Sequence, residues 1–247
     1  MTLQKRRFTF LGTGTSSGVP IIGCTCAVCL SNDEKDKRLR TSAMLTFENQ
    51  DNTHTKNIII DTGPDFRQQM LREKVTDIEA IIFTHQHNDH TAGLDDIRPI
   101  NFQKNNAMPI YATPSVQNDL QQRFSYAFDK NPYPGAPKLA LMNISKDKKF
   151  TIQDLIEVQP IEVMHGKLPI LGFRFDDLTY ITDCKTIEYI EFKKLMGTKI
   201  LVLSALHHKE HHAHMTLKQA LELVEVLKPE QTYFTHISHG MGKNIRY

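Results

Sequence analysis

The chain has 247 residues, long enough to bury a full hydrophobic core, and we expect one domain over residues 1–247. Its 30 Lys and Arg against 28 Asp and Glu give a formal net charge of +2 with both signs interspersed, so a long nucleic acid is not an expected partner. No apolar run approaches the length of a membrane span, and the basic residues 1–10 lack the apolar stretch of a signal peptide. We therefore expect a cytoplasmic protein with no membrane partner.

Short runs rich in β-branched and aromatic residues alternate with helical periodicity, which predicts layered strands and helices. The strands are predicted at residues 8–11, 43–47, 57–60, 80–83, 156–163, 178–181, 200–203 and 231–234, and the helices at 66–73, 187–196 and 217–228. The last helix is the best defined, because Thr216 and Gln219 have the spacing of a capping box and Pro229 follows its end. Residues 102–149 are loosely patterned, and we expect them to cap a site.

A dense group of metal-binding residue types follows the predicted strand at 80–83, in the order His85, His87, Asp89 and His90. In an extended segment residues two apart share a face, so His85 and His87 can point at one ion. A turn of the chain would then direct Asp89 and His90 at another. The spacing predicts half of a two-metal site.

Three other apolar runs end in the same way, with His165, Asp183 and His236 placed where a strand should stop. Scaffolds present functional groups at strand ends, and imidazole and carboxylate ligands suit zinc, iron or manganese. A single such residue is more often a turn or cap residue. Four coordinated cases favour the metal-site interpretation.

A cysteine cluster near the N-terminus has the spacing Cys-x-Cys-x-x-Cys, at Cys24, Cys26 and Cys29. Three thiolates satisfy three corners of a tetrahedral structural zinc and leave one position for a ligand from elsewhere, for which His239 is the candidate. The alternative is that these are inert buried thiols. Cys184 is left without a role.

The segment from Thr84 to His90 resembles the motif of the metallo-β-lactamase superfamily, and the later ligand candidates fall where that family has them. The resemblance implies an α+β fold, a four-layer αββα metallo-β-lactamase sandwich, with two divalent ions, zinc or manganese. It further implies a first metal held by His85, His87 and His165, a second held by Asp89, His90 and His236, and Asp183 bridging them.

With the cysteine cluster, the chain resembles a narrower group, the cyclic phosphate phosphodiesterases of the PhnP type, which carry an extra structural zinc. The resemblance implies a binuclear hydrolase that cleaves a small phosphodiester, cyclic ones included, through a metal-bound hydroxide that Asp89 orients. It gives His214 the role of general acid and leaves open how His214 is held, since related tRNase Z enzymes have an acidic residue where Ser204 stands. A homodimer is also expected from the resemblance.

Two further residues are candidates for binding substrate, His211 and Arg98. The histidines near position 211 are more typical of a solvated loop, and Arg98 has a salt bridge with Asp95 or Asp96 as its alternative role. By contrast, Asp61 is interpreted as structural.

Two rival functions remain. An RNA endonuclease similar to tRNase Z would need a protruding basic arm, for which the chain offers only residues 131–138. A non-catalytic carrier similar to pyrroloquinoline quinone biosynthesis protein B shares the cysteine cluster, but the complete ligand set disfavours it.

Overall fold

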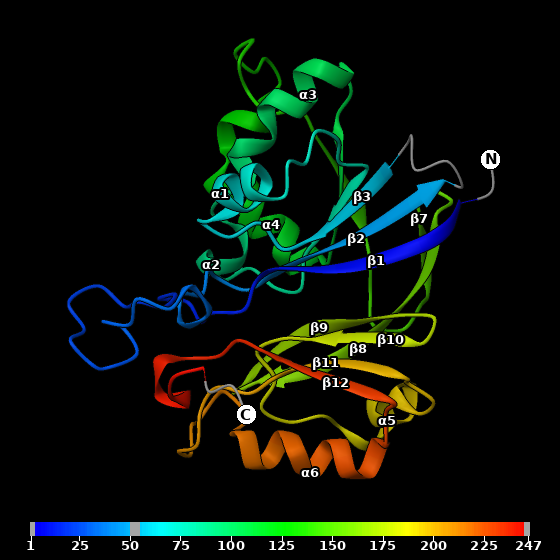
Figure 1. Ribbon diagram of the computed structural model, residues 1–247. Coiled ribbons are helices and arrows are strands. Elements are labelled where there is room, and N and C mark those ends of the chain that lie inside the picture. The colour runs from blue at the N-terminus through cyan, green and yellow to red at the C-terminus, as the bar shows by residue number, and fades with distance from the viewer. Residues whose placement is uncertain (1–2, 50–54, 245–247) are drawn as a thin grey trace. The chain divides into compact units, whose positions relative to one another are not determined.

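The computed structural model describes residues 3–49 and 55–244, which form two six-stranded mixed sheets with their helices (Figure 1). The chain divides into two compact units, and each is described by itself. The first unit comprises Met1–Leu11, Ser42–Ser145 and Ile152–Leu155, and the second comprises Gly12–Thr41, Lys146–Thr151 and Ile156–Tyr247.

The first sheet has the order β1-β2-β3-β4-β5-β6. Its strands are β1 (Leu3–Gly12), β2 (Ser42–Asn49), β3 (Thr55–Ile60), β4 (Ala80–Ile82), β5 (Met108–Ala112) and β6 (Leu139–Asn143). β2 and β3 pair antiparallel, whereas β3 to β6 are parallel neighbours. The carboxyl ends of β3 and β4 therefore lie at one edge of the sheet.

Helices α1 (Phe66–Arg72), α3 (Arg98–Lys104) and α4 (Pro114–Arg123) lie beside this sheet in Figure 1. Their buried apolar residues, Phe66, Ile100 and Leu120 among them, pack with Ile59, Ile81 and Ile110 of the strands in one core. The segment 102–149 is more regular than its sequence indicates, since it supplies β5, α4 and β6. The sequence of α4 shows little helical periodicity, because only two of its residues, Val116 and Leu120, are buried.

The second sheet has the order β12-β11-β10-β9-β8-β7. Its strands are β7 (Phe150–Ile152), β8 (Ile156–His165), β9 (Leu168–Phe175), β10 (Leu178–Ile181), β11 (Ile200–Ser204) and β12 (Gln231–Thr235). β8, β9 and β10 are antiparallel neighbours, whereas β10, β11 and β12 are parallel. The parallel strands bring the residues that follow β10, β11 and β12 to one edge.

Helix α6 (Leu217–Leu227) begins with the predicted capping box, in which the Thr216 side chain accepts from the Gln219 amide and the Gln219 side chain accepts from the Thr216 amide. Its Ala220 and Leu227 pack on the sheet with Ile181, Leu201 and Leu203. The predicted helix at 187–196 is shorter, with α5 (Tyr189–Phe192) followed by a 3₁₀ turn at Lys193–Leu195. Within the described residues no helix is both long and apolar enough to cross a membrane.

Candidate metal centres

In the first unit, the four residues of the motif follow β4 directly. His87 is the N-cap of the short helix α2 (Asn88–Thr91), whose first turn holds Asp89 and His90. The ring centroids of His85 and His87 are 4.6 Å apart, and those of His85 and His90 are 4.2 Å apart. Asp89 Oδ2 lies 3.3 Å from His90 Nε2. A strand end and a helix start thus gather three imidazoles and a carboxylate, as the spacing predicts.

Two of these imidazoles are oriented by a buried group around Asp61. The Asp61 carboxylate accepts the Thr84 amide at 2.9 Å, the Thr84 hydroxyl at 2.7 Å and His90 Nδ1 at 2.7 Å. Because the Thr84 hydroxyl gives its hydrogen to Asp61, His85 Nδ1 must donate to Thr84 Oγ1, 3.0 Å away. Both rings therefore carry their proton on Nδ1 and offer the Nε2 lone pair.

This arrangement is typical of metal sites, where a ligating histidine donates its other N–H to a carboxylate or hydroxyl that fixes its orientation. Asp61 is fully buried, and burial raises the pKa of its carboxyl, while the hydrogen bonds from His90 and Thr84 lower it. Sequence reasoning gave Asp61 a structural role and missed its bond to His90. This bond could have been predicted from the position of Asp61 directly after β3, since β3 lies next to β4 in the sheet.

In the second unit, His165 ends β8, Asp183 follows β10 and His236 follows β12. Asp183 and His236 both adopt the left-handed conformation, with φ of 52° at each. Asp183 Oδ1 lies 3.0 Å from His236 Nε2, and its Oδ2 accepts from the Thr182 hydroxyl at 2.6 Å. Ligand atoms of His165, Asp183 and His214 lie within 4.8 Å of one another. This unit therefore gathers its own set of imidazoles around a carboxylate.

The loop from His207 to His214 is fixed to this set by backbone groups. His165 Nδ1 donates to the Ala213 carbonyl at 3.0 Å, which leaves Nε2 of His165 as the ligand atom. On the other side of His214, the Met215 amide donates to the Cys184 carbonyl at 2.8 Å.

Ser204 is connected to the His214 loop through the backbone of Cys184. Its hydroxyl accepts from the Cys184 amide at 3.0 Å, and the same peptide segment receives the Met215 amide. His214 is thus held through main-chain bonds rather than by a side chain at position 204. The loop is therefore held in place without an acidic residue at position 204.

His214 itself is 9% exposed, and its ring stacks on His236 with centroids 4.6 Å apart. Its Nδ1 is 3.8 Å from Asp183 Oδ1 and makes no hydrogen bond within the described part of the chain. Burial first, and then His236, lower the pKa of His214 to about 3, against the opposite effect of Asp183. The imidazole is therefore neutral at neutral pH.

The donors present in the two units fit divalent metal ions. Each set combines imidazole nitrogen with carboxylate oxygen, the ligands that zinc and manganese accept. Three histidines, His85, His90 and His165, have Nδ1 occupied by an oxygen partner, which directs Nε2 to a ligand.

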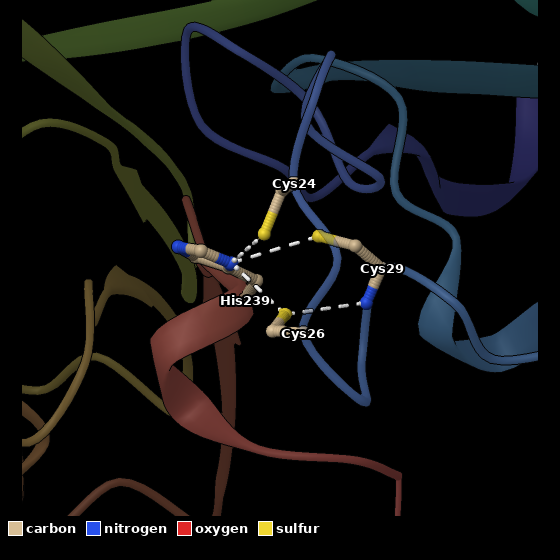
Figure 2. A group of neighbouring side chains, drawn as sticks. All are labelled: Cys24, Cys26, Cys29 and His239. Atoms are coloured by element: carbon tan, nitrogen blue, oxygen red, sulfur yellow. Dashed lines mark hydrogen bonds between the residues drawn. The ribbon is translucent and has the colours of Figure 1, made fainter.

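The cysteine cluster and His239 form a separate group in the second unit (Figure 2). The Sγ atoms of Cys24, Cys26 and Cys29 lie 3.4, 3.3 and 3.5 Å from His239 Nδ1. A tetrahedron with zinc–sulfur bonds of about 2.3 Å and zinc–nitrogen bonds of about 2.0–2.1 Å has a sulfur–nitrogen edge of roughly 3.5 Å. The four atoms therefore have the spacing of a tetrahedral metal site.

The thiols in this group differ in acidity. The amide of Cys29, followed by His239, lowers the pKa of Cys26 to about 6, whereas burial raises that of Cys29 to about 11. One thiolate is thus available at neutral pH before a metal binds, which favours metal capture.

The two candidate substrate residues lie in different surroundings. The His211 ring is 5.0 Å from the ring of His214, beside the second set. Arg98 is paired with Asp95 at 2.7 Å and donates to the Tyr133 hydroxyl at 3.3 Å. The salt bridge offered as its alternative role is present, and phosphate binding by Arg98 stays a prediction.

Comparison with known proteins identifies the family. Residues 56–237 match the model described as the β-lactamase superfamily domain. The crystal structure of a new diphosphatase from the PhnP family is 40% identical, with a TM-score of 0.86, covering 97% of this chain and 89% of that one. Zinc-bound PqqB from Methylobacterium extorquens shares the fold at 16% identity, with a TM-score of 0.76, covering 96% of this chain and 90% of its own.

A curated octanoyltransferase from Porphyromonas gingivalis is 40% identical over 94% of this chain, but the match covers only 46% of that protein. This chain spans about half the length of the first curated relatives that it matches. More than half of the octanoyltransferase therefore lies outside the match, and its name describes that longer protein. From the matched domain and the near full-length likeness, the chain belongs to the β-lactamase superfamily, with its metallo-β-lactamase fold of two mixed sheets and helices, and within it to the PhnP family.

Proposed function

We propose that this chain is a metal-dependent hydrolase of small phosphate esters, in which the two ligand sets act as one binuclear site. The observation that carries the proposal is the orientation of the histidines. His90 and His165 each use Nδ1 for an internal oxygen partner, as metal ligands do. Membership of the PhnP family supports a phosphate ester as substrate, and the similar protein described as a diphosphatase supports phosphodiesters and diphosphates as the classes to test.

The residues that would hold the metals are those of the motif and the later strand ends. We assign His85, His87 and His165 to one ion, Asp89, His90 and His236 to the other, and Asp183 to both. When bound, two divalent ions supply charge stabilisation for the phosphoryl oxygens and lower the pKa of a water towards about 7. Cys24, Cys26, Cys29 and His239 would hold a structural zinc.

Asp89 is the residue that we assign to the nucleophile. Its side chain is 15% exposed, and it lies beside His90, so it can accept a hydrogen bond from an attacking water and orient that water.

His214 is assigned to the leaving oxygen. Its neutral imidazole can donate one N–H there, whereas proton transfer requires the negative charge of bound phosphate to raise its low pKa. The main-chain bonds of Ala213 and Met215 on either side hold the ring in place for this role.

The test is hydrolysis by protein reconstituted with Mn²⁺ or Zn²⁺, assayed on bis(p-nitrophenyl) phosphate, a cyclic nucleotide, a dinucleoside diphosphate and a precursor tRNA. We expect turnover of small esters and none of the tRNA. His214→Ala should lower kcat at least about tenfold with unchanged metal content, while the exposed neighbour His208→Ala should not. Asp183→Asn should lower metal content.

Four results would contradict parts of the proposal. Retained activity in His214→Ala would end its assignment, and loss of metal in that variant would make His214 a ligand instead. Protein that holds only the zinc of the cysteine group and hydrolyses no ester would favour a non-catalytic carrier. Cleavage of the precursor tRNA would favour the endonuclease.

A further inference from the structure

The loop between β11 and α6 carries five histidines, and three of their rings form a row that leads away from the second ligand set. The centroids of His214 and His211 are 5.0 Å apart, and those of His211 and His207 are 6.2 Å apart. His214 is buried, whereas His211 and His207 are half-buried. The row thus runs from the proposed reaction centre towards solvent.

The outer two rings have a defined tautomer. His207 Nδ1 accepts the Lys209 amide at 3.2 Å, and His211 Nδ1 accepts the Ala213 amide at 3.2 Å. A neutral imidazole has one acceptor and one N–H, so the proton of each neutral ring is on Nε2. Over residues 3–49 and 55–244, neither Nε2 makes a hydrogen bond to the protein. Both histidines therefore present an N–H donor that the fold itself does not use.

The charged residues around the row compensate one another, so they leave room for an anion. The acidic residue of the loop, Glu210, is paired with Lys185 and accepts from Gln219 at 3.3 Å. Its charge is thus already compensated. Lys185 also lies close enough to His211 to contribute to its lowered pKa, after burial and the neighbouring histidines. The Lys185–Glu210 pair is neutral overall, so the two unused N–H donors are what suit the row to phosphate oxygens, which form strong hydrogen bonds because they are ionised.

We propose that His211 and His207 bind a second phosphoryl group, adjacent to the one that reacts near His214. The inference rests on the proposed function and narrows it, because it makes diphosphate diesters preferred over phosphodiesters with a single phosphorus. In the reaction, water adds to one phosphorus and the bond from that phosphorus to the bridging oxygen breaks. One proton of the water stays on the attacking oxygen, the other passes to the leaving phosphate oxygen or to solvent, and the products are two phosphate monoesters.

His207 is the better residue to substitute, because it lies farther from the ligand set than His211 does. In the metal-reconstituted protein, His207→Leu should raise KM for a dinucleoside diphosphate about tenfold, as expected for one lost hydrogen bond to a charged group, with kcat within about twofold. Its kinetics on bis(p-nitrophenyl) phosphate should not change. His207→Gln keeps an N–H at similar reach and should restore most of the KM.

His208→Ala is the matched control, since His208 is an exposed neighbour whose Nε2 lies 3.4 Å from the Met241 carbonyl. It should leave both substrates unchanged. An equal loss on both substrates in His207→Leu, or no loss on either, would overturn the inference. Circular dichroism and zinc content identify a variant that has not folded, and His207→Gln then carries the comparison with wild type.

A binding measurement separates this inference from the proposed function. If the wild type hydrolyses neither ester, the proposed function fails. Calorimetry with methylenediphosphonate and methylphosphonate then tests the subsite alone. We expect His207→Leu to bind the diphosphonate about tenfold more weakly than wild type and the monophosphonate equally well. Equal affinity of both proteins for the diphosphonate would refute the second phosphate site.

Discussion

Replacing Asp61 by Asn should weaken metal binding without unfolding the chain. Asn has the shape of Asp and tolerates the left-handed conformation that Asp61 adopts, with φ of 63°. The carboxylate accepts three hydrogen bonds from His90 and Thr84, and two of these end on Oδ2. An amide group in either orientation puts an N–H against at least one of those donors. His90 would then lose the acceptor that fixes its ring, or Thr84 would turn away from His85.

The size of the effect follows from the role of such oxygen partners in metal sites. Their loss typically lowers metal affinity by about 10–100-fold, which corresponds to roughly 1.4–2.7 kcal/mol. Competition with a chelating dye measures this affinity directly for Mn²⁺ and Zn²⁺. Asp154→Asn is the matched control, because Asp154 is an exposed aspartate that is also left-handed, with φ of 55°. Unchanged metal affinity in a stably folded Asp61→Asn protein would refute the orienting role and return Asp61 to a purely structural one.

Three further predictions concern folding and thiol chemistry. Gly93→Ala should lower the free energy of unfolding by at least about 2 kcal/mol in urea titration, because a Cβ there would lie 2.2 Å from the Gly63 carbonyl oxygen; wild-type stability would contradict that contact. Thr216→Ala should cost about 1 kcal/mol in the same assay through the lost helix cap, and Thr216→Ser should restore it. After zinc removal by a chelator, iodoacetamide should label Cys26 before the buried Cys184, with a rate that falls below about pH 6; a labelling rate that already falls below about pH 8.5, the range of an ordinary thiol, would be inconsistent with the lowered pKa of Cys26.

Local pattern was enough to predict the elements whose signal lies in neighbouring residues. The strand expected at 178–181 is β10 (Leu178–Ile181), and the capping box at Thr216 is present as predicted. Each is set by side chains within a few positions, so periodicity and cap chemistry are sufficient. By contrast, α4 has mostly polar residues and depends on two apolar contacts with the sheet. Tertiary packing, which the sequence does not display, determines that helix.

The ligand types were predictable for the same reason, whereas their supports were not. His85 to His90 form a compact motif, but the bond from His90 to Asp61 joins residues 29 positions apart. It becomes visible only when β3 and β4 are known to be parallel neighbours. His165 is oriented by the main-chain carbonyl of Ala213. Every residue has such a carbonyl, so the sequence does not indicate which one accepts this hydrogen bond. The sequence therefore identifies the ligand side chains, but not the backbone groups that orient them.

Strand-end residues of both units share one backbone conformation, although the residue in the first unit orients a ligand and those in the second unit are ligands themselves. Asp61, Asp183 and His236 follow parallel strands, and all three have positive φ. A residue other than glycine in this region costs of order 1 kcal/mol or more, and such strain persists only where surrounding contacts enforce it. Here the contacts are the bonds of Asp61 to Thr84 and of Asp183 to Thr182. The left-handed residue turns the chain sharply at the sheet edge, so that the side chain lies beside those of the neighbouring strand ends. Glycine would adopt this backbone more easily, but it would supply no carboxylate or imidazole, so these groups stand at the sheet edge at the cost of backbone strain.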